Sequence, residues 1–255
     1  MAKERRFSLP HEHGGYLTLA GSVAVGALEA PRPSVAIGLG LALAAAFFAR
    51  GPLEQRAGKR GRFDRALLAA LLLLAVIGGL VAAPAGAVAW LAVALPALLV
   101  GSSLLARMRR LHRHPLFELS GMGFLGACAG LLAWAGGAPW PTAATAAIAC
   151  AANAVAAVPL VRSELRPRER TFSARAELAA VALCVVGALV IAALPPVAPS
   201  GAALLSRGGR SLALVPRLVA ILQRRLAPLT LSPTSVGLRE TGILVATVAL
   251  LVIHA

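Results

Sequence analysis

Three acidic side chains of this sequence lie beside long apolar runs, where a carboxylate is costly unless it is paired or hydrated. They are Glu118, Glu177 and Glu240, and Arg239 directly precedes the last of them. Carboxyl and imidazole groups are common proton carriers in catalysis, so we take Glu118, Glu177 and His13 as candidate catalytic residues. The alternative is structural, because an acid near a helix N-terminus is stabilised by about 0.3–1 kcal/mol through the helix dipole.

Arginine-rich segments accompany these acids and indicate that the protein binds a phosphate group. Residues 50–65 contain six cations, and residues 162–175 contain five. A guanidinium group binds phosphate through its planar fork of N–H donors. The candidate ligand-binding residues are Arg50, Glu54, Arg56, Asp64, Arg113, Asn153, Arg162, Glu164, Arg166 and Glu240. The ligand that we expect is an anionic, phosphate-bearing lipid or isoprenoid.

Two His-x-His pairs are a possible source of metal ligands. They are His11 with His13 and His112 with His114, and the second pair precedes Glu118. Imidazole and carboxylate groups bind zinc and other transition metals, but neither pair has the spacing of a metal motif. We therefore assign no metal ligands, leave a metal site at these pairs open, and regard the cofactor as unknown.

The composition predicts a membrane protein. Apolar residues make up 58% of the chain and charged residues 14%, against roughly 25% charged in a soluble domain. The formal charge of +15 would suit nucleic acid, but the cations lie in short loops beside apolar spans and only 4% of residues are aromatic. Membrane lipids, rather than nucleic acid, are therefore the expected partners. Cys128, Cys150 and Cys184 stand singly in apolar runs and are expected to be buried.

Apolar runs long enough for helical spans cover most of the chain. Crossing the hydrocarbon core takes about 20 mostly apolar residues. The expected spans are 14–30, 33–49, 66–83, 86–106, 116–137, 141–161, 175–194, 211–227 and 236–254. The segment 211–227 is short and contains Arg217, Arg224 and Arg225. The prediction is an all-α bundle of about nine spans, forming a single domain over residues 1–255.

The arginines predict how this bundle is oriented. With nine spans, 21 of the 25 cations fall on the side of the N-terminus. Cations are enriched in cytoplasmic loops, so this side is expected to be cytoplasmic. Residues 10–15 interrupt the basic start, and no clear cleavage site follows, so the first span is expected to be retained. The chain is thus expected to be a multi-pass protein of a bacterial plasma membrane.

The first expected span opens with Pro10, His13, Gly14, Gly15 and Tyr16. This segment resembles the Pro-x-x-His-Gly-Ala-Trp pattern of the YwiC-like family of bacterial membrane proteins. The basic run into the Glu-bearing helix at 113–121 and the arginine loop at 161–166 also fit the plan of that family. The family has no established activity, so the resemblance implies a topology rather than a reaction.

The expected layout is also similar to that of the UbiA superfamily of membrane prenyltransferases. In those enzymes, aspartate-rich motifs after the second and sixth spans hold magnesium against a prenyl diphosphate. The corresponding segments here, 50–65 and 162–177, contain arginines and no Asn-Asp-x-x-Asp series. Magnesium requires oxygen ligands, so the resemblance implies at most a divergent transferase without this metal motif.

Two other functions are consistent with the sequence. A transporter or flippase would need polar groups across the membrane, and in the outer half only Glu29 and Asn153 qualify. Asn153 would either bond to a neighbouring helix or line a cavity. The other alternative is a non-catalytic assembly protein whose arginines only set its orientation. Gly79 and Gly121 are expected at close helix contacts in each case.

Overall fold

The computed structural model describes residues 13–57, 65–109, 115–165, 170–195, 210–226 and 233–253. Over these residues the chain forms nine α-helices and two short 3₁₀ segments, and no strand. The α-helices are α1 (His13–Glu29), α2 (Pro33–Ala57), α3 (Arg65–Ala82), α4 (Leu91–Met108), α5 (Pro115–Ala135), α6 (Trp140–Leu165), α7 (Arg170–Ala193), α9 (Val215–Leu226) and α10 (Pro233–Ile253). The 3₁₀ segments are η1 (Ala83–Trp90) and η4 (Leu212–Leu214).

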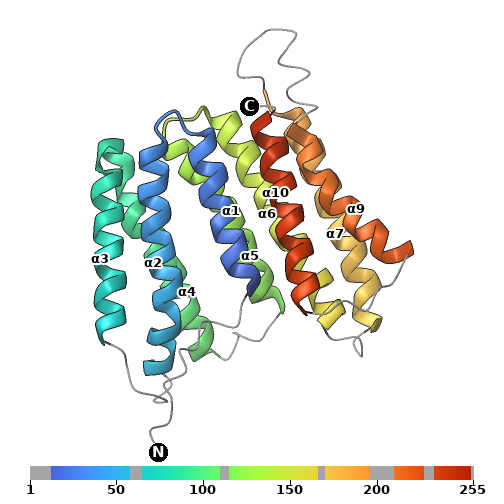
Figure 1. The fold of residues 1–255 in the computed structure, drawn as a ribbon, viewed down its shortest axis with the longest axis horizontal. Helices are drawn as coiled ribbons and strands as arrows, with labels where there is room; N and C mark the ends of the chain where they lie inside the picture. The colour runs from blue at the N-terminus through green and yellow to red at the C-terminus, as the bar shows by residue number, and fades with distance from the viewer. Residues whose placement is uncertain are drawn as a thin grey trace, which may run out of the picture.

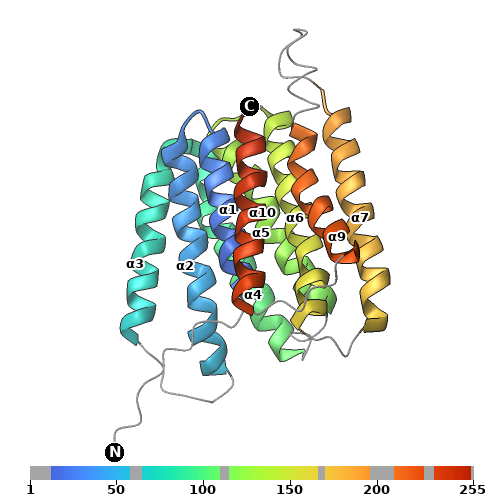
Figure 2. The same cartoon turned by 45° about the vertical axis from the view of Figure 1, so that its right-hand side comes forward.

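The helices stand side by side in one bundle (Figures 1 and 2). Consecutive helices run in opposite directions, so α1, α3, α5, α7 and α10 all begin at the same end. We call this the inner end, because the arginine distribution predicts that it faces the cytoplasm. The opposite end is called the outer end. Which end faces the cytoplasm stays a prediction.

Each of the nine expected spans coincides with a helix, and five segments are apolar and long enough to cross a bilayer. These are Pro33–Arg50, Leu68–Gly86, Val88–Ala106, Leu116–Ala135 and Trp140–Val161. The chain is therefore a helical membrane protein, whereas the full number of crossings stays a prediction. The helix least suited to crossing a bilayer is α9. Its 12 residues extend about 18 Å, whereas the hydrocarbon core is about 30 Å thick.

The buried apolar side chains form two main clusters. The first contains Leu43, Phe47 and Leu132 and joins α1, α2, α4 and α5. The second contains Ile191 and Leu251 and joins α6, α7 and α10, with contributions from α1 and α5. The bundle thus has an N-terminal half and a C-terminal half that share α1 and α5. As expected, the three cysteines are buried.

Glycines allow α5 and α6 to approach each other closely. A Cβ atom on Gly126 would lie 2.6 Å from the backbone of Cys150 and Ala151, and one on Gly130 would overlap the carbonyl oxygen of Ala143. The expectation for Gly121 was wrong, because among the described residues no atom beyond its own stretch of helix lies within 4 Å of its Cβ position. Gly79 makes only an ordinary contact, 3.8 Å to Ala92 Cβ. The composition indicated glycine packing correctly, but which glycines take part depends on the helix face that meets a neighbour.

Candidate functional site

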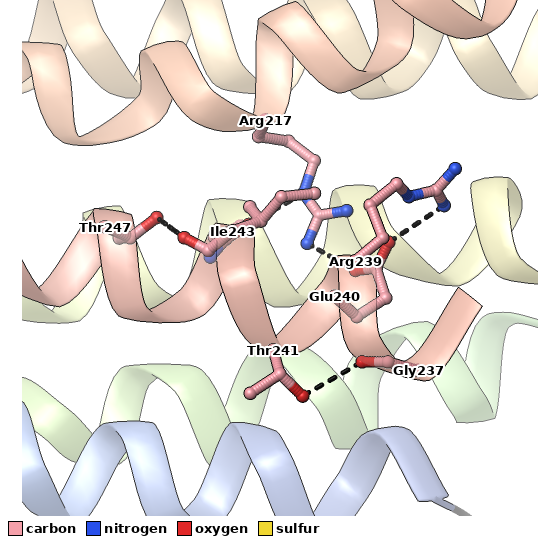
Figure 3. Close-up of polar contacts among 8 residues, drawn as sticks. Arg217, Gly237, Arg239, Glu240, Thr241, Ile243 and Thr247 are labelled. Carbon is pink, nitrogen blue, oxygen red and sulfur yellow. Dashed lines mark hydrogen bonds and ion pairs between the residues drawn. The ribbon is translucent and has the colours of Figure 1, made fainter. Parts of the chain in front are cut away.

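Arg217 lies inside the C-terminal half of the bundle, where α9 meets α6 and α10. Its residue surface is only 3% exposed. The guanidinium Nε donates a hydrogen bond to Asn153 Oδ1 on α6 at 2.7 Å. Its Nη2 lies 2.7 Å from Glu240 Oε2 on α10. Figure 3 shows the Arg217 side chain reaching from α9 to this carboxylate.

Further polar contacts extend from Arg217 along α10. Asn153 Nδ2 donates to Thr247 Oγ1 at 3.3 Å, and Thr247 Oγ1 donates to the carbonyl of Ile243 at 2.9 Å. At the other side, Arg239 Nη2 lies 3.1 Å from Glu240 Oε1. We call Asn153, Arg217, Arg239, Glu240 and Thr247 the Arg217 network. It connects the middle of α6 to the inner half of α10.

The sequence explains why these side chains converge. Ala152, Ala154 and Ala156 surround Asn153 on α6 and are small and buried, which permits close approach of neighbouring helices. Glu240 and Thr247 are seven residues apart, about two turns, and so share one face of α10. Charged groups among apolar helices are stable only when they are paired, which explains the contacts of Arg217 with Glu240 and Asn153.

One nitrogen of Arg217 is left without a partner. Its Nη1 is buried and has no hydrogen-bond partner among the described residues. A buried donor left in this way costs about 1–3 kcal/mol. In Figure 3 the remaining nitrogen points along α10 toward the side where Arg239 lies. An oxygen acceptor at this position, above all an oxyanion, would complete the hydrogen bonding of the guanidinium group.

A second buried polar cluster lies at the outer end. Arg210, which precedes η4, places its Nη2 3.5 Å from Glu29 Oε2 at the end of α1. Its Nη1 donates to Thr142 Oγ1 at the start of α6, at 3.4 Å. The side chains of Arg210 and Glu29 are only 11% and 3% exposed. The outer end therefore holds an ion pair that the sequence indicated only through Glu29.

The structure brings together two of the predicted site residues, Asn153 and Glu240, through their common partner Arg217. Of the predicted catalytic residues, Glu177 is buried on α7, whereas Glu118 is exposed near the start of α5. Arg50 lies near the inner end of α2 with its guanidinium carbon 5.2 Å from the centroid of the Phe47 ring.

The other predicted residues have no described side chains. His13 begins α1, Glu54 and Arg56 belong to α2, and Arg162 and Glu164 belong to α6. Asp64, Arg113 and Arg166 lie outside the described residues. Among the side chains that the structure describes, no three His, Cys, Asp or Glu residues form a metal-binding group. The two His-x-His pairs lie outside those side chains, and their assignment stays a prediction.

Sequence reasoning missed the central role of Arg217 and the partner role of Arg210. In the sequence, Arg217 only makes the segment 211–227 less suited to crossing a membrane, and no pattern indicates a partner for Arg210. One signal could have identified Arg217, because an arginine inside an apolar segment is by default a candidate functional residue.

Comparisons with known proteins identify a family for half of the chain. The model of the family described as YwiC-like protein matches residues 9–135, which include α1 to α5. The predicted resemblance is therefore confirmed over that stretch. Searches of curated proteins and of solved structures gave no match. The Arg217 network lies entirely beyond the matched residues, in the C-terminal half.

Proposed function

We infer, from the premise that residues 9–135 form a YwiC-like region of a membrane protein, that this protein binds an anionic amphiphile inside its helix bundle. The ligand is a phosphate-bearing lipid or isoprenoid. The observation that carries this proposal is the buried guanidinium of Arg217, which has an unused donor nitrogen. A phosphate oxygen at Nη1 would offset the cost of that donor, and its charge would interact favourably with the guanidinium group.

The surroundings of Arg217 favour a ligand with an apolar tail. On the same helix, Val219 and Leu222 are exposed, as are Leu189 and Val190 on α7. In a bilayer these side chains face hydrocarbon. A head group at Arg217 would therefore leave its tail among lipid chains and the apolar surfaces of α7 and α9. A water-soluble anion has no tail, so it would gain nothing from these apolar surfaces.

The arginine-rich segments at the inner end would serve a different purpose in this proposal. Anionic lipid surfaces attract nearby Lys and Arg residues with about 1 kcal/mol per cation. Arg50 and the cations of 50–65 and 162–175 would therefore concentrate anionic head groups near the inner end. Binding, rather than a reaction of the ligand, is the function proposed.

Lipid analysis of the purified protein tests this function. The protein would be purified in a mild detergent, and the lipids retained per polypeptide would be quantified by mass spectrometry. We expect an anionic lipid or isoprenoid phosphate to be enriched over its share of the membrane. Replacing Arg217 by Gln should reduce its retention about tenfold, because a charge-assisted hydrogen bond is lost.

Arg32→Gln is the matched control, because Arg32 is an exposed arginine in the outer turn between α1 and α2. This variant should retain the same lipid as the wild type. Equal retention by Arg217→Gln and the wild type, with both variants monodisperse by gel filtration, would exclude Arg217 as the binding residue.

A further inference from the structure

The two buried ion pairs of the C-terminal half belong to one helical segment. We call Glu29–Arg210 the outer ion pair and Arg217–Glu240 the inner ion pair. Both arginines come from residues 210–226, where they are seven residues apart with the 3₁₀ segment η4 between them. Their acidic partners come from different helices, α1 and α10. Two ion pairs therefore hold the segment 210–226 at two depths in the bundle.

Between the two arginines, the segment 210–226 places an apolar side chain in the protein interior. Leu214 lies between Arg210 and Arg217 in sequence and is fully buried. It packs toward α7 at Gly187, where an added Cβ would lie 3.1 Å from Leu214 Cδ1.

The facing side of α6 has only small or polar side chains between the two ion pairs. Thr142 bonds to Arg210 and Asn153 bonds to Arg217. Between them, on the same face, lie the buried residues Ala146, Ala149 and Cys150. These side chains are small, so this face of α6 presents no bulky group between the two ion pairs.

We propose that the protein moves the anionic head group of its ligand between the inner and outer ends, by opening the two ion pairs in turn. The ligand oxyanion, bound first at Arg217 Nη1, takes the place of Glu240 on Arg217 and then the place of Glu29 on Arg210. Each guanidinium therefore keeps an anionic partner, and the displaced Glu240 keeps Arg239 as its cation. This transport activity rests on the proposed function for the identity of the ligand and for its binding at Arg217.

Two native cysteines report on opening beside the inner ion pair. Cys150 is one turn of α6 from Asn153, which bonds to Arg217, and Cys184 of α7 belongs to the same buried cluster as Leu214 and Ile221. Cys128 is buried in the apolar cluster of the N-terminal half and serves as the internal control. All three thiols are inaccessible in the closed bundle, so their reaction with a small thiol reagent measures local opening.

The first test compares thiol labelling rates by mass spectrometry without added ligand. Glu29→Gln/Arg210→Gln removes the outer pair without leaving one charge alone, and Arg217→Gln/Glu240→Gln does the same at the inner pair. We expect the second variant to accelerate labelling of Cys150 and Cys184 about tenfold, because it removes the contacts that hold residues 210–226 against α6 and α10 near these thiols. The first variant should accelerate their labelling less, because its ion pair lies at the outer end. The labelling rate of Cys128 should be the same in both variants as in the wild type. Equal acceleration at Cys128, or no acceleration at either reporter, would overturn the proposal.

The second test measures transport in reconstituted vesicles with fluorescent phosphatidylglycerol as the probe. Wild-type protein should expose the inner-leaflet probe to an external quencher faster than protein-free vesicles do. The Glu29→Gln/Arg210→Gln variant should retain phosphatidylglycerol on purification but lose this exchange. If the wild type binds phosphatidylglycerol and exchanges it no faster than empty vesicles, the transport activity is excluded while the binding function stands. Loss of binding itself would instead exclude the proposed function.

Discussion

A guanidinium group shielded from water needs an acceptor for each of its N–H donors, and within the described part of the chain Arg217 finds them at Asn153 and Glu240 alone. The carboxylate of Glu240 is also shared with Arg239. A buried ion pair is weak evidence for stability, because desolvation of both charges opposes their attraction. We propose that a ligand, rather than a contribution to folding, accounts for the incomplete bonding of Arg217.

Single and paired substitutions at Arg217 should differ in their effect on stability. Arg217→Gln leaves Glu240 with one cation fewer and should lower the free energy of unfolding by about 1–3 kcal/mol. Adding Glu240→Gln should recover part of this loss, because neither buried group is then charged. Denaturant unfolding in detergent, followed by tryptophan fluorescence, measures both values. A double variant less stable than the single one would contradict this explanation.

Ser22 gives a smaller and simpler prediction. Its Oγ donates to the carbonyl of Leu125 on α5 at 2.7 Å, and the residue is 1% exposed. Ser22→Ala removes one hydrogen bond between helices and should cost about 0.6–1.5 kcal/mol. Ser120→Ala is the control, because exposed Ser120 bonds only to Phe117 of its own helix. Thermal unfolding should distinguish the two variants, and an equal loss in both would argue against the α1–α5 bond.

At the scale of the helix, α5 depends on small residues along one face. Gly126 and Gly130 are four residues apart and both meet the backbone of α6. This is the small-x-x-x-small arrangement that allows membrane helices to pack closely. The same helix also carries Gly121, which has open space in front of its Cβ position.

Leucine substitutions on α5 test this packing. Gly130→Leu would place a side chain against the carbonyl oxygen of Ala143, so α5 and α6 would have to separate. We expect this variant to be strongly destabilised, by about 3 kcal/mol or more, or to fail to fold. Gly121→Leu should express and elute from gel filtration like the wild type. Destabilisation of both variants alike would contradict the contact that we describe.

The helices themselves could be predicted from the sequence, because in lipid a backbone satisfies its hydrogen bonds within a helix and needs about 20 apolar residues to cross. Which helices pack against one another could not be predicted from the sequence. Arg217 meets Asn153 across 64 residues, and no periodicity in the chain encodes that contact. Likewise, Glu118 and Glu177 occupy similar places in the sequence, but one is exposed and the other buried, because burial depends on which neighbour covers each helix face.

At the scale of the whole molecule, the chain has two halves with different properties. The YwiC-like half contains four of the five segments that are long and apolar enough to span a membrane. In this half α3 is the most exposed of the five, as expected for a helix at the lipid boundary. The C-terminal half has the shortest of the described α-helices, α9, and both of the arginine-centred clusters described above. The polar site therefore lies in the half with fewer membrane-spanning segments.

Orientation of the bundle is testable with introduced cysteines, since the native ones are buried. Ser34 is exposed at the outer end of α2, and Met108 is exposed at the inner end of α4. If the arginine-rich end is cytoplasmic, an impermeant maleimide should label Ser34→Cys in intact spheroplasts but label Met108→Cys only after lysis. The reverse labelling pattern would show that the arginine-rich end faces away from the cytoplasm.

The most direct test of the account is an experimental density map of the protein purified with its own lipids. At a resolution that separates head groups from water, we predict density for an anionic head group within hydrogen-bonding distance of Arg217 Nη1, with its tail continuing along α7 and α9. A lone water molecule at Nη1, or no density beside it, would contradict the claim that Arg217 binds a ligand.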